Sequence, residues 1–114
     1  MNKQDFPLLA WLVFVAAAAL EVGGDGAIRK GLRGSGWSFL VVGCLMLASY
    51  GLVVNLVQWD FSKLLGVYVA VFALVSILAG RFLFGEEIPV ATWVGLGIII
   101  VGGLVVQFGG LILK

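Results

Sequence analysis

Two carboxylates interrupt an apolar stretch near the start of the chain, in the segment "AALEVGGDG" (residues 18–26). The fifteen residues that precede Glu21 carry no charge. Asp25 follows Glu21 by four positions, so on a helix the two side chains would lie one turn apart on similar faces. A carboxylate in a membrane segment is energetically costly, and it usually faces a protein interior or a watery cavity where it binds a proton or an ion. These two residues are therefore the first candidates for a cation-binding site.

The helix that carries Glu21 has to include this residue in order to cross a membrane. A helix from Pro7 to Ile28 would have its centre between Ala17 and Ala18, about 5 Å from Glu21 at 1.5 Å per residue. A helix that ended before Glu21 would be about 22 Å long, too short for a hydrocarbon core of about 30 Å. This favours a functional glutamate inside the membrane. The alternative is a structural glutamate that reaches the interface or is neutralised by a partner.

Asp25 has two interpretations, and the sequence leaves both open. It can form an i, i+4 ion pair with Arg29 near the lipid headgroups. It can instead line a vestibule through which a cation reaches Glu21. The surrounding glycines of "VGGDG" permit either the close approach of a second helix or a kink at this point.

The chain as a whole has the composition of an integral membrane protein. Of its 114 residues, 62% are hydrophobic and 11% are charged, whereas soluble domains have about 25% charged residues. A small soluble domain could not bury so much apolar surface. Four apolar stretches predict transmembrane helices at about residues 6–28, 37–58, 64–84 and 88–113, each about 20 to 25 residues long. We therefore predict an all-α integral membrane fold in which residues 1–114 form a single four-helix transmembrane domain.

The connections between these helices are short. "RKGLRGSG" (residues 29–36) is a basic, glycine-rich loop, and "FGEEIP" (residues 84–89) is a tight turn with Pro89 in the first turn of the fourth helix. "QWDFSK" (residues 58–63) offers Ser62 as a cap for the third helix. Lys3 and the run "AAAA" also loosely fit a cleaved signal peptide, although Asp5 argues against one.

The chain offers little for catalysis or metal binding. It has no histidine and a single cysteine, Cys44, which alone can form neither an internal disulfide nor a metal cluster and which we expect to be a small core residue. No pair of nucleophile and base is visible. We expect no enzymatic activity, no metal, no cofactor and no nucleic-acid partner.

The basic residues are divided almost evenly between the two sides of the membrane. Three would lie on the side of the termini (Lys3, Lys63, Lys114) and four on the other (Arg29, Lys30, Arg33, Arg81). Membrane proteins are oriented by an excess of Lys and Arg on the cytoplasmic side. Either the basic cluster at residues 29–33 selects one orientation, or the chain inserts in both. Four helices are too few to enclose a substrate path, but an antiparallel homodimer would reproduce the inverted repeats of many transporters.

Other residues are candidates by their type and position. Tyr50 on the second helix and Tyr68 and Ser76 on the third are possible neighbours of Glu21. Tyr68 is preferred, because a phenol hydroxyl in a dry interior needs a polar partner. On the fourth helix, Gly95 and Gly102 lie seven residues apart on one face, and small residues let membrane helices pack closely. They predict a dimer interface.

Together these features resemble the small multidrug resistance family of the drug/metabolite transporter superfamily over nearly the whole chain. "AALEVGG" resembles the family's signature in its first helix, "FLFGEEI" resembles its turn between helices three and four, and the spacing of Gly95 and Gly102 matches its dimerisation motif. The resemblance implies that Glu21 is the essential glutamate that binds a proton and a cation alternately. It places Tyr68 where the family usually carries a tryptophan and Leu65 where it usually carries a tyrosine.

The chain also departs from the familiar exporters of this family. Its third helix, "DFSKLLGVYVAVF", differs from that of the quaternary ammonium and guanidinium exporters, and Asp25 and the pair Arg29–Lys30 are unusual. The resemblance therefore indicates a divergent branch, and it implies architecture and proton coupling more than any particular substrate.

The sequence and the resemblance lead to one predicted function with two alternatives. We predict a proton-coupled exporter of small organic or hydrophobic cations, acting as an antiparallel homodimer in the bacterial inner membrane. One alternative is a transporter of a lipid-linked or anionic metabolite, whose headgroup the basic loop would attract. The other is a non-transporting membrane subunit that assembles through its fourth helix.

Overall fold

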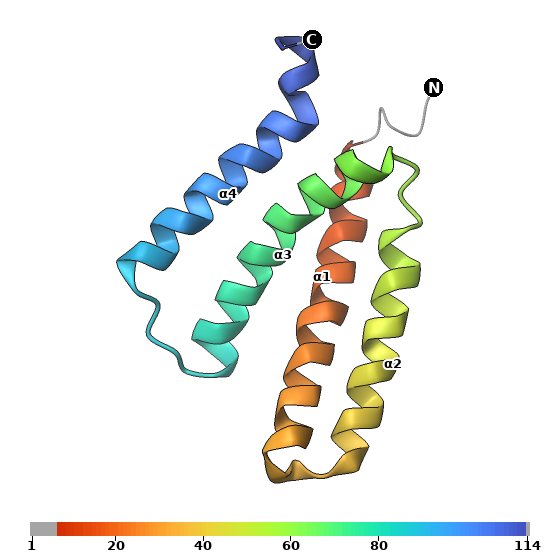
Figure 1. The fold of residues 1–114 in the computed structure, drawn as a ribbon, viewed down its shortest axis with the longest axis vertical. Coiled ribbons are helices and arrows are strands. Elements are labelled where there is room, and N and C mark those ends of the chain that lie inside the picture. Colours follow the sequence, from red (N-terminus) through yellow and green to blue (C-terminus); the bar gives the residue numbers. More distant parts are fainter. Residues whose placement is uncertain (1–6, 114) are drawn as a thin grey trace. The chain divides into compact units, whose positions relative to one another are not determined.

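The computed structural model describes residues 7–113, and most of them belong to long helices (Figure 1). The helices are α1 (Pro7–Lys30), α2 (Trp37–Val54), α3 (Phe61–Leu83) and α4 (Val90–Phe108), with short helical turns η2 (Gly31–Ser35) and η3 (Gly109–Leu111). All four long helices are long and apolar enough to cross a membrane, with mean hydropathies from 1.7 to 2.1. In lipid, a helix satisfies its backbone hydrogen bonds internally. The predicted all-α, four-helix integral membrane fold is confirmed.

The helices end a few residues from where the apolar stretches end. α2 ends at Val54, short of Gln58, and the Asn55 side-chain amide donates a hydrogen bond to the Gly51 carbonyl (2.8 Å). Such side-chain bonds offer the backbone an alternative to continuing the helix. α1 runs two residues past Ile28, while the predicted start at Phe6 lies outside the described residues.

The starts of α3 and α4 correct two smaller predictions. α3 begins at Phe61, so Ser62 lies inside its first turn and is not its cap; Asp60 precedes the helix, and its carbonyl accepts a hydrogen bond from the Leu64 N–H (2.8 Å). Pro89 lies immediately before α4, one position earlier than predicted. Its carbonyl accepts hydrogen bonds from the first turn, and its missing N–H is no loss at a helix start, where such groups have no partner in the helix.

The first of two compact units is a hairpin formed by α1 and α2, which lie side by side and antiparallel (Figure 1). Glycines bring the two backbones close together. Three of them lie directly against the opposite helix: Gly31 against Leu40, Gly43 against Ile28, and Gly24 against Leu47. From each pair to the next, the residue of η2 or α1 moves back by as many positions as the α2 residue moves forward. This regular step defines the register of the hairpin.

The same contacts decide between the two roles considered for the glycines of "VGGDG". α1 continues as an α-helix through these glycines to Lys30. A methyl group at Gly24 would lie 2.9 Å from the Gly43 carbonyl oxygen. Close helix approach is therefore the role of Gly24, and the helix continues unbroken through this segment.

The predicted core position of Cys44 is wrong, because the side chain is exposed. Cys44 follows Gly43, so it lies about 100° around α2 from the residue that packs against α1. A small side chain in an apolar helix carries no signal of which way it faces.

We expect Gly43→Ala to destabilise the α1–α2 hairpin. The added methyl would lie 2.5 Å from the Ile28 Cγ1 atom and 2.7 Å from the Gly24 carbonyl oxygen, and the backbone cannot move aside without separating the helices. Overpacking of this kind lowers the free energy of unfolding by about 1 to 3 kcal/mol, which equilibrium unfolding in detergent would measure.

The matched control for that variant is Gly51→Ala on the same helix. A methyl group there would meet nothing within 4 Å, and alanine is the better helix former by about 1 kcal/mol. Its stability should be unchanged or slightly higher. Equal free energies of unfolding for both variants would show that the close approach at Gly43 contributes nothing to the stability of the hairpin.

The second compact unit contains α3 and α4, which also run antiparallel (Figure 1). Gly103 lies against Ala70, where an added methyl would be 2.8 Å from the Ala70 Cβ atom. In the turn, Gly85 has a φ of +65°, and the Glu86 N–H donates a hydrogen bond to the Gly80 carbonyl (3.0 Å). Because Gly80 has no side chain, the Glu86 carboxylate can lie directly over it. The turn predicted from "FGEEIP" thus depends on Gly85 within it and on Gly80 in the last turns of α3.

Candidate functional site

Glu21 lies close to the middle of a membrane-spanning helix. The midpoint of α1 falls between Ala18 and Ala19, about 4 Å along the axis from Glu21 at 1.5 Å per residue. The side chain is half-buried. Extending the helix to Lys30 moves the midpoint towards Glu21, so the glutamate is nearer the centre than the sequence indicated.

Tyr50 lies opposite Glu21 across the α1–α2 hairpin. The last of the three contacts described above pairs Gly24 with Leu47. Three residues further in the same register, Glu21 faces Tyr50. Four residues beyond that, Ala17 faces Val54, and these two side chains have exposed fractions of 0% and 2%. Tyr50 also lies close enough to Glu21 to interact with it electrostatically. The hairpin therefore brings together two of the predicted site residues.

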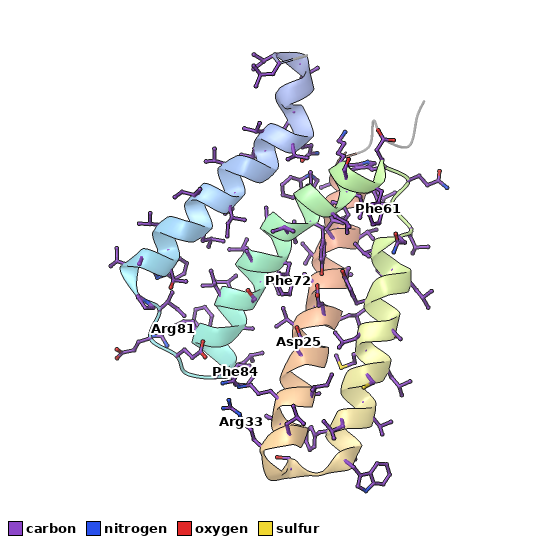
Figure 2. The ribbon with its side chains drawn as sticks, in the orientation of Figure 1. Asp25, Arg33, Phe61, Phe72, Arg81 and Phe84 are labelled. Carbon is purple, nitrogen blue, oxygen red and sulfur yellow. The ribbon has the colours of Figure 1, made fainter. Side chains whose placement is uncertain are left out.

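Asp25 is exposed on α1, one turn from Glu21 towards the end of the helix (Figure 2). Its distance from the midpoint of α1 is about 10 Å along the axis. Within residues 7–113 no ion pair joins Asp25 to Arg29, and both side chains are exposed. The ion-pair interpretation is therefore not supported, and the vestibule stays a prediction.

Tyr68 and Ser76 belong to α3, in the other hairpin. Tyr68 is 3% exposed, and its ring centre lies 6.3 Å from that of Phe72, which Figure 2 labels. The Ser76 hydroxyl donates a hydrogen bond to the Ala73 carbonyl of its own helix (2.9 Å). Ser76 is thus satisfied locally and is a weaker candidate than Tyr68. A role for either residue beside Glu21 stays a prediction.

Gly95 and Gly102 lie on a part of α4 that does not pack against α3. A methyl group added at either one would meet no atom within 4 Å. Leu96 and Gly103, the residues that follow them, are buried. The predicted interface is therefore not used in the packing of α4 on α3, and it stays available for a second chain.

One residue important for the site was missed in the sequence. Gly43 sets the register that places Tyr50 opposite Glu21, yet it stands in an ordinary apolar run, "VVGCL". Its only signal is its size, and glycine is frequent throughout membrane helices. Its partner had to be known before its role could be recognised.

The fold and this polar pair define the class of protein, a multi-pass integral membrane protein with a glutamate inside its first membrane-spanning helix. The chain is similar to a UPF0060 membrane protein of Rhodococcus erythropolis (strain PR4 / NBRC 100887), with 36% identity over 69 residues. The match covers 59% of this chain and 64% of the relative, so the chain spans slightly less than two thirds of that protein's length. No protein-family model matches the chain. No solved structure matches it significantly.

The name of this relative agrees with a membrane protein and adds no activity. Resemblance to the small multidrug resistance family rests on the sequence motifs alone. The activity of the chain has to be argued from its residues.

Proposed function

We propose that the chain is a proton-coupled exporter of small organic or hydrophobic cations, similar to the small multidrug resistance family. The observation that carries the proposal is Glu21, a carboxylate about 4 Å from the midpoint of a membrane-spanning helix. An ionisable group at that depth is rare without a function, because of its cost in lipid. Tyr50 of α2 lies close enough to interact with it electrostatically.

The carboxylate couples the two fluxes because it can be neutralised in two ways. Either a proton or an organic cation balances its charge, and in a site of low dielectric constant an unbalanced charge is strongly disfavoured. The protonated state and the cation-bound state of the carboxylate therefore exclude each other. Binding of a cation releases the proton, and binding of a proton releases the cation. If the site opens alternately to the two sides of the membrane, a proton gradient drives export of the cation.

We propose that two chains in opposite orientations form the transporter in the bacterial inner membrane. Two features support this. The basic residues are divided three to four between the two sides, which gives a weak orientation signal. Gly95 and Gly102 also leave part of α4 open for close approach of a second helix. Two Glu21 carboxylates, one from each subunit, would then lie in the central region of the dimer.

The proposal is tested with the purified full-length protein in proteoliposomes. Tetraphenylphosphonium serves as a hydrophobic organic cation, and solid-supported-membrane electrophysiology extends the assay to a panel of smaller cations and anions. We expect the cation to accumulate against its gradient in the acidic compartment, and only to equilibrate without a pH gradient. Proton-independent movement of an anion would favour the metabolite transporter instead. No flux of any compound would favour the non-transporting subunit.

A further inference from the structure

Three basic residues gather at the closed end of the α1–α2 hairpin. Arg29 and Lys30 are the last two residues of α1, and Arg33, which Figure 2 labels, lies in η2. All three side chains are exposed, and within residues 7–113 no ion pair joins any of them to a carboxylate. We call residues 29–36, from Arg29 to the last residue before α2, the basic turn.

The positive charge of the basic turn is largely uncompensated. The chain has no Asp or Glu between residues 26 and 59. Asp25, one helical turn before Arg29, is the nearest carboxylate along the chain, and it can balance one of the three positive charges at most. The basic turn therefore attracts anions.

The depth of the basic turn matches the level of lipid headgroups. Arg29 and Lys30 lie about 16 and 17 Å along the axis from the midpoint of α1, and Trp37 lies about 13 Å from the midpoint of α2. The hydrocarbon core ends about 15 Å from the centre of a bilayer. When the hairpin spans a membrane, the phosphate groups of the lipids are thus the anions closest to these side chains.

Two apolar side chains beside the cations also fit a lipid interface. Leu32 is 74% exposed and Trp37 is 76% exposed. Tryptophan is enriched at the boundary between hydrocarbon and headgroups, where its ring contacts the hydrocarbon and its N–H the polar region. A bound lipid would cover these two side chains, which would otherwise remain in water.

The backbone of the basic turn is held in one shape. Gly31 lies against Leu40 of α2, where an added methyl would be 2.8 Å from the Leu40 Cγ atom. Gly34 and Gly36 have φ values of +109° and +106°, which other residues rarely adopt. Binding of a ligand therefore has to order the side chains but not the loop, and this lowers its entropic cost.

We propose that the basic turn is a binding site for the headgroup of an anionic phospholipid, whose phosphate is contacted by Arg29, Lys30 and Arg33. The guanidinium groups donate paired hydrogen bonds to phosphate oxygens, and the ammonium group adds a point charge. A zwitterionic lipid has the same phosphate, but its own cation cancels the charge, so the site prefers a lipid with a net negative charge. The lipid is bound at the rim of the hairpin and is not transported, so this site goes beyond the proposed function and does not depend on it.

The test is native mass spectrometry of the purified full-length protein in an uncharged maltoside detergent. It is titrated with phosphatidylglycerol or with phosphatidylcholine of the same acyl chains, and the Kd of the first bound lipid is measured. We expect phosphatidylglycerol to bind at least about fivefold more tightly, and we expect this preference to shrink as the ammonium acetate concentration rises. In detergent, the orientation that the chain adopts on membrane insertion has no influence on the result.

Arg33→Gln should weaken phosphatidylglycerol binding about fivefold, equivalent to about 1 kcal/mol for one basic residue at a lipid surface. The triple variant Arg29→Gln, Lys30→Gln, Arg33→Gln should bind the two lipids equally. The matched control is Arg81→Gln at the exposed end of α3, where Glu86 and Glu87 follow in the turn. It should keep the wild-type affinity for phosphatidylglycerol.

Three results would overturn the proposal. The first is equal affinity of the wild-type protein for the two lipids, and the second is an equal loss in Arg33→Gln and Arg81→Gln. The third is a triple variant that dissociates from a protein partner or a second chain while keeping its preference for phosphatidylglycerol, since the basic turn would then bind protein.

Two further measurements keep the test decisive. Soluble glycerol phosphate, added at the concentration of the lipid, should not displace phosphatidylglycerol, and displacement would show that the site binds a free phosphate instead of a lipid. If circular dichroism shows that the triple variant does not fold, Arg33→Lys decides together with Arg33→Gln. The lysine variant keeps the charge and should retain the preference for phosphatidylglycerol, and loss of this preference in Arg33→Lys but not in Arg33→Gln would contradict the proposal.

Discussion

Glu21→Gln should abolish proton-coupled cation flux in proteoliposomes. The glutamine keeps nearly the shape of the glutamate, but it has no charge to attract a cation and no carboxyl to bind a proton. We expect the rate to fall by about 100-fold or more, equivalent to about 3 kcal/mol at 1.4 kcal/mol per tenfold. Proton release upon addition of tetraphenylphosphonium should also disappear. Size-exclusion chromatography and circular dichroism should show an intact four-helix protein, because the substitution removes a charge that is costly in lipid.

The matched control is Glu87→Gln, the same substitution at an exposed position in the turn between α3 and α4. It should transport at the wild-type rate. Glu21→Asp should keep exchange with a shifted pH dependence, because the carboxylate survives on a shorter side chain.

Asp25 is the strongest alternative to Glu21 as the carboxylate that exchanges protons for cations. As a vestibule residue about 10 Å from the midpoint of α1, it should contribute less than Glu21, and Asp25→Asn should only weaken transport. If Glu21→Gln transports at the wild-type rate while Asp25→Asn is inactive, the exchange site has been assigned to the wrong carboxylate.

Gly102→Leu should dissociate the proposed dimer and abolish transport while leaving each chain folded. Among the described residues, a methyl group at Gly102 meets no neighbouring atom within 4 Å, so we expect the larger side chain to leave the packing of α4 on α3 undisturbed. It would block the approach of a second α4, since membrane helices associate through close backbone contact at small residues. Cross-linking in lipid and light scattering in detergent would measure the loss of dimer.

Two other glycines of α4 make this result interpretable. Gly97 is likewise open but lies about 140° around the helix from Gly102, so Gly97→Leu should keep the dimer. Gly103 lies against Ala70, so Gly103→Leu should separate α4 from α3 and lower the stability of the chain itself. Unchanged cross-linking of Gly102→Leu in both lipid and detergent would count against an interface on this face.

The number and type of the helices could be predicted from the sequence. Apolar stretches of about 20 residues have few alternatives in a membrane, because every backbone polar group in lipid has to be satisfied within the segment. The same argument placed Glu21 inside the membrane, since a helix ending before it would have been too short. Both predictions depend on length and composition, which are properties of a segment taken by itself.

Which side of each helix packs against another was decided only by the tertiary structure. Helices that are apolar all round carry no stripe of polar residues to mark their outer face, so the exposure of Cys44 could not be foreseen. The end of α2 could not be predicted either, because a hydrogen bond from the Asn55 side chain marks it in the folded structure. The pairing of Glu21 with Tyr50 follows from the register that Gly24 and Gly43 impose on the hairpin. That register is a property of two surfaces in contact, and neither helix encodes it alone.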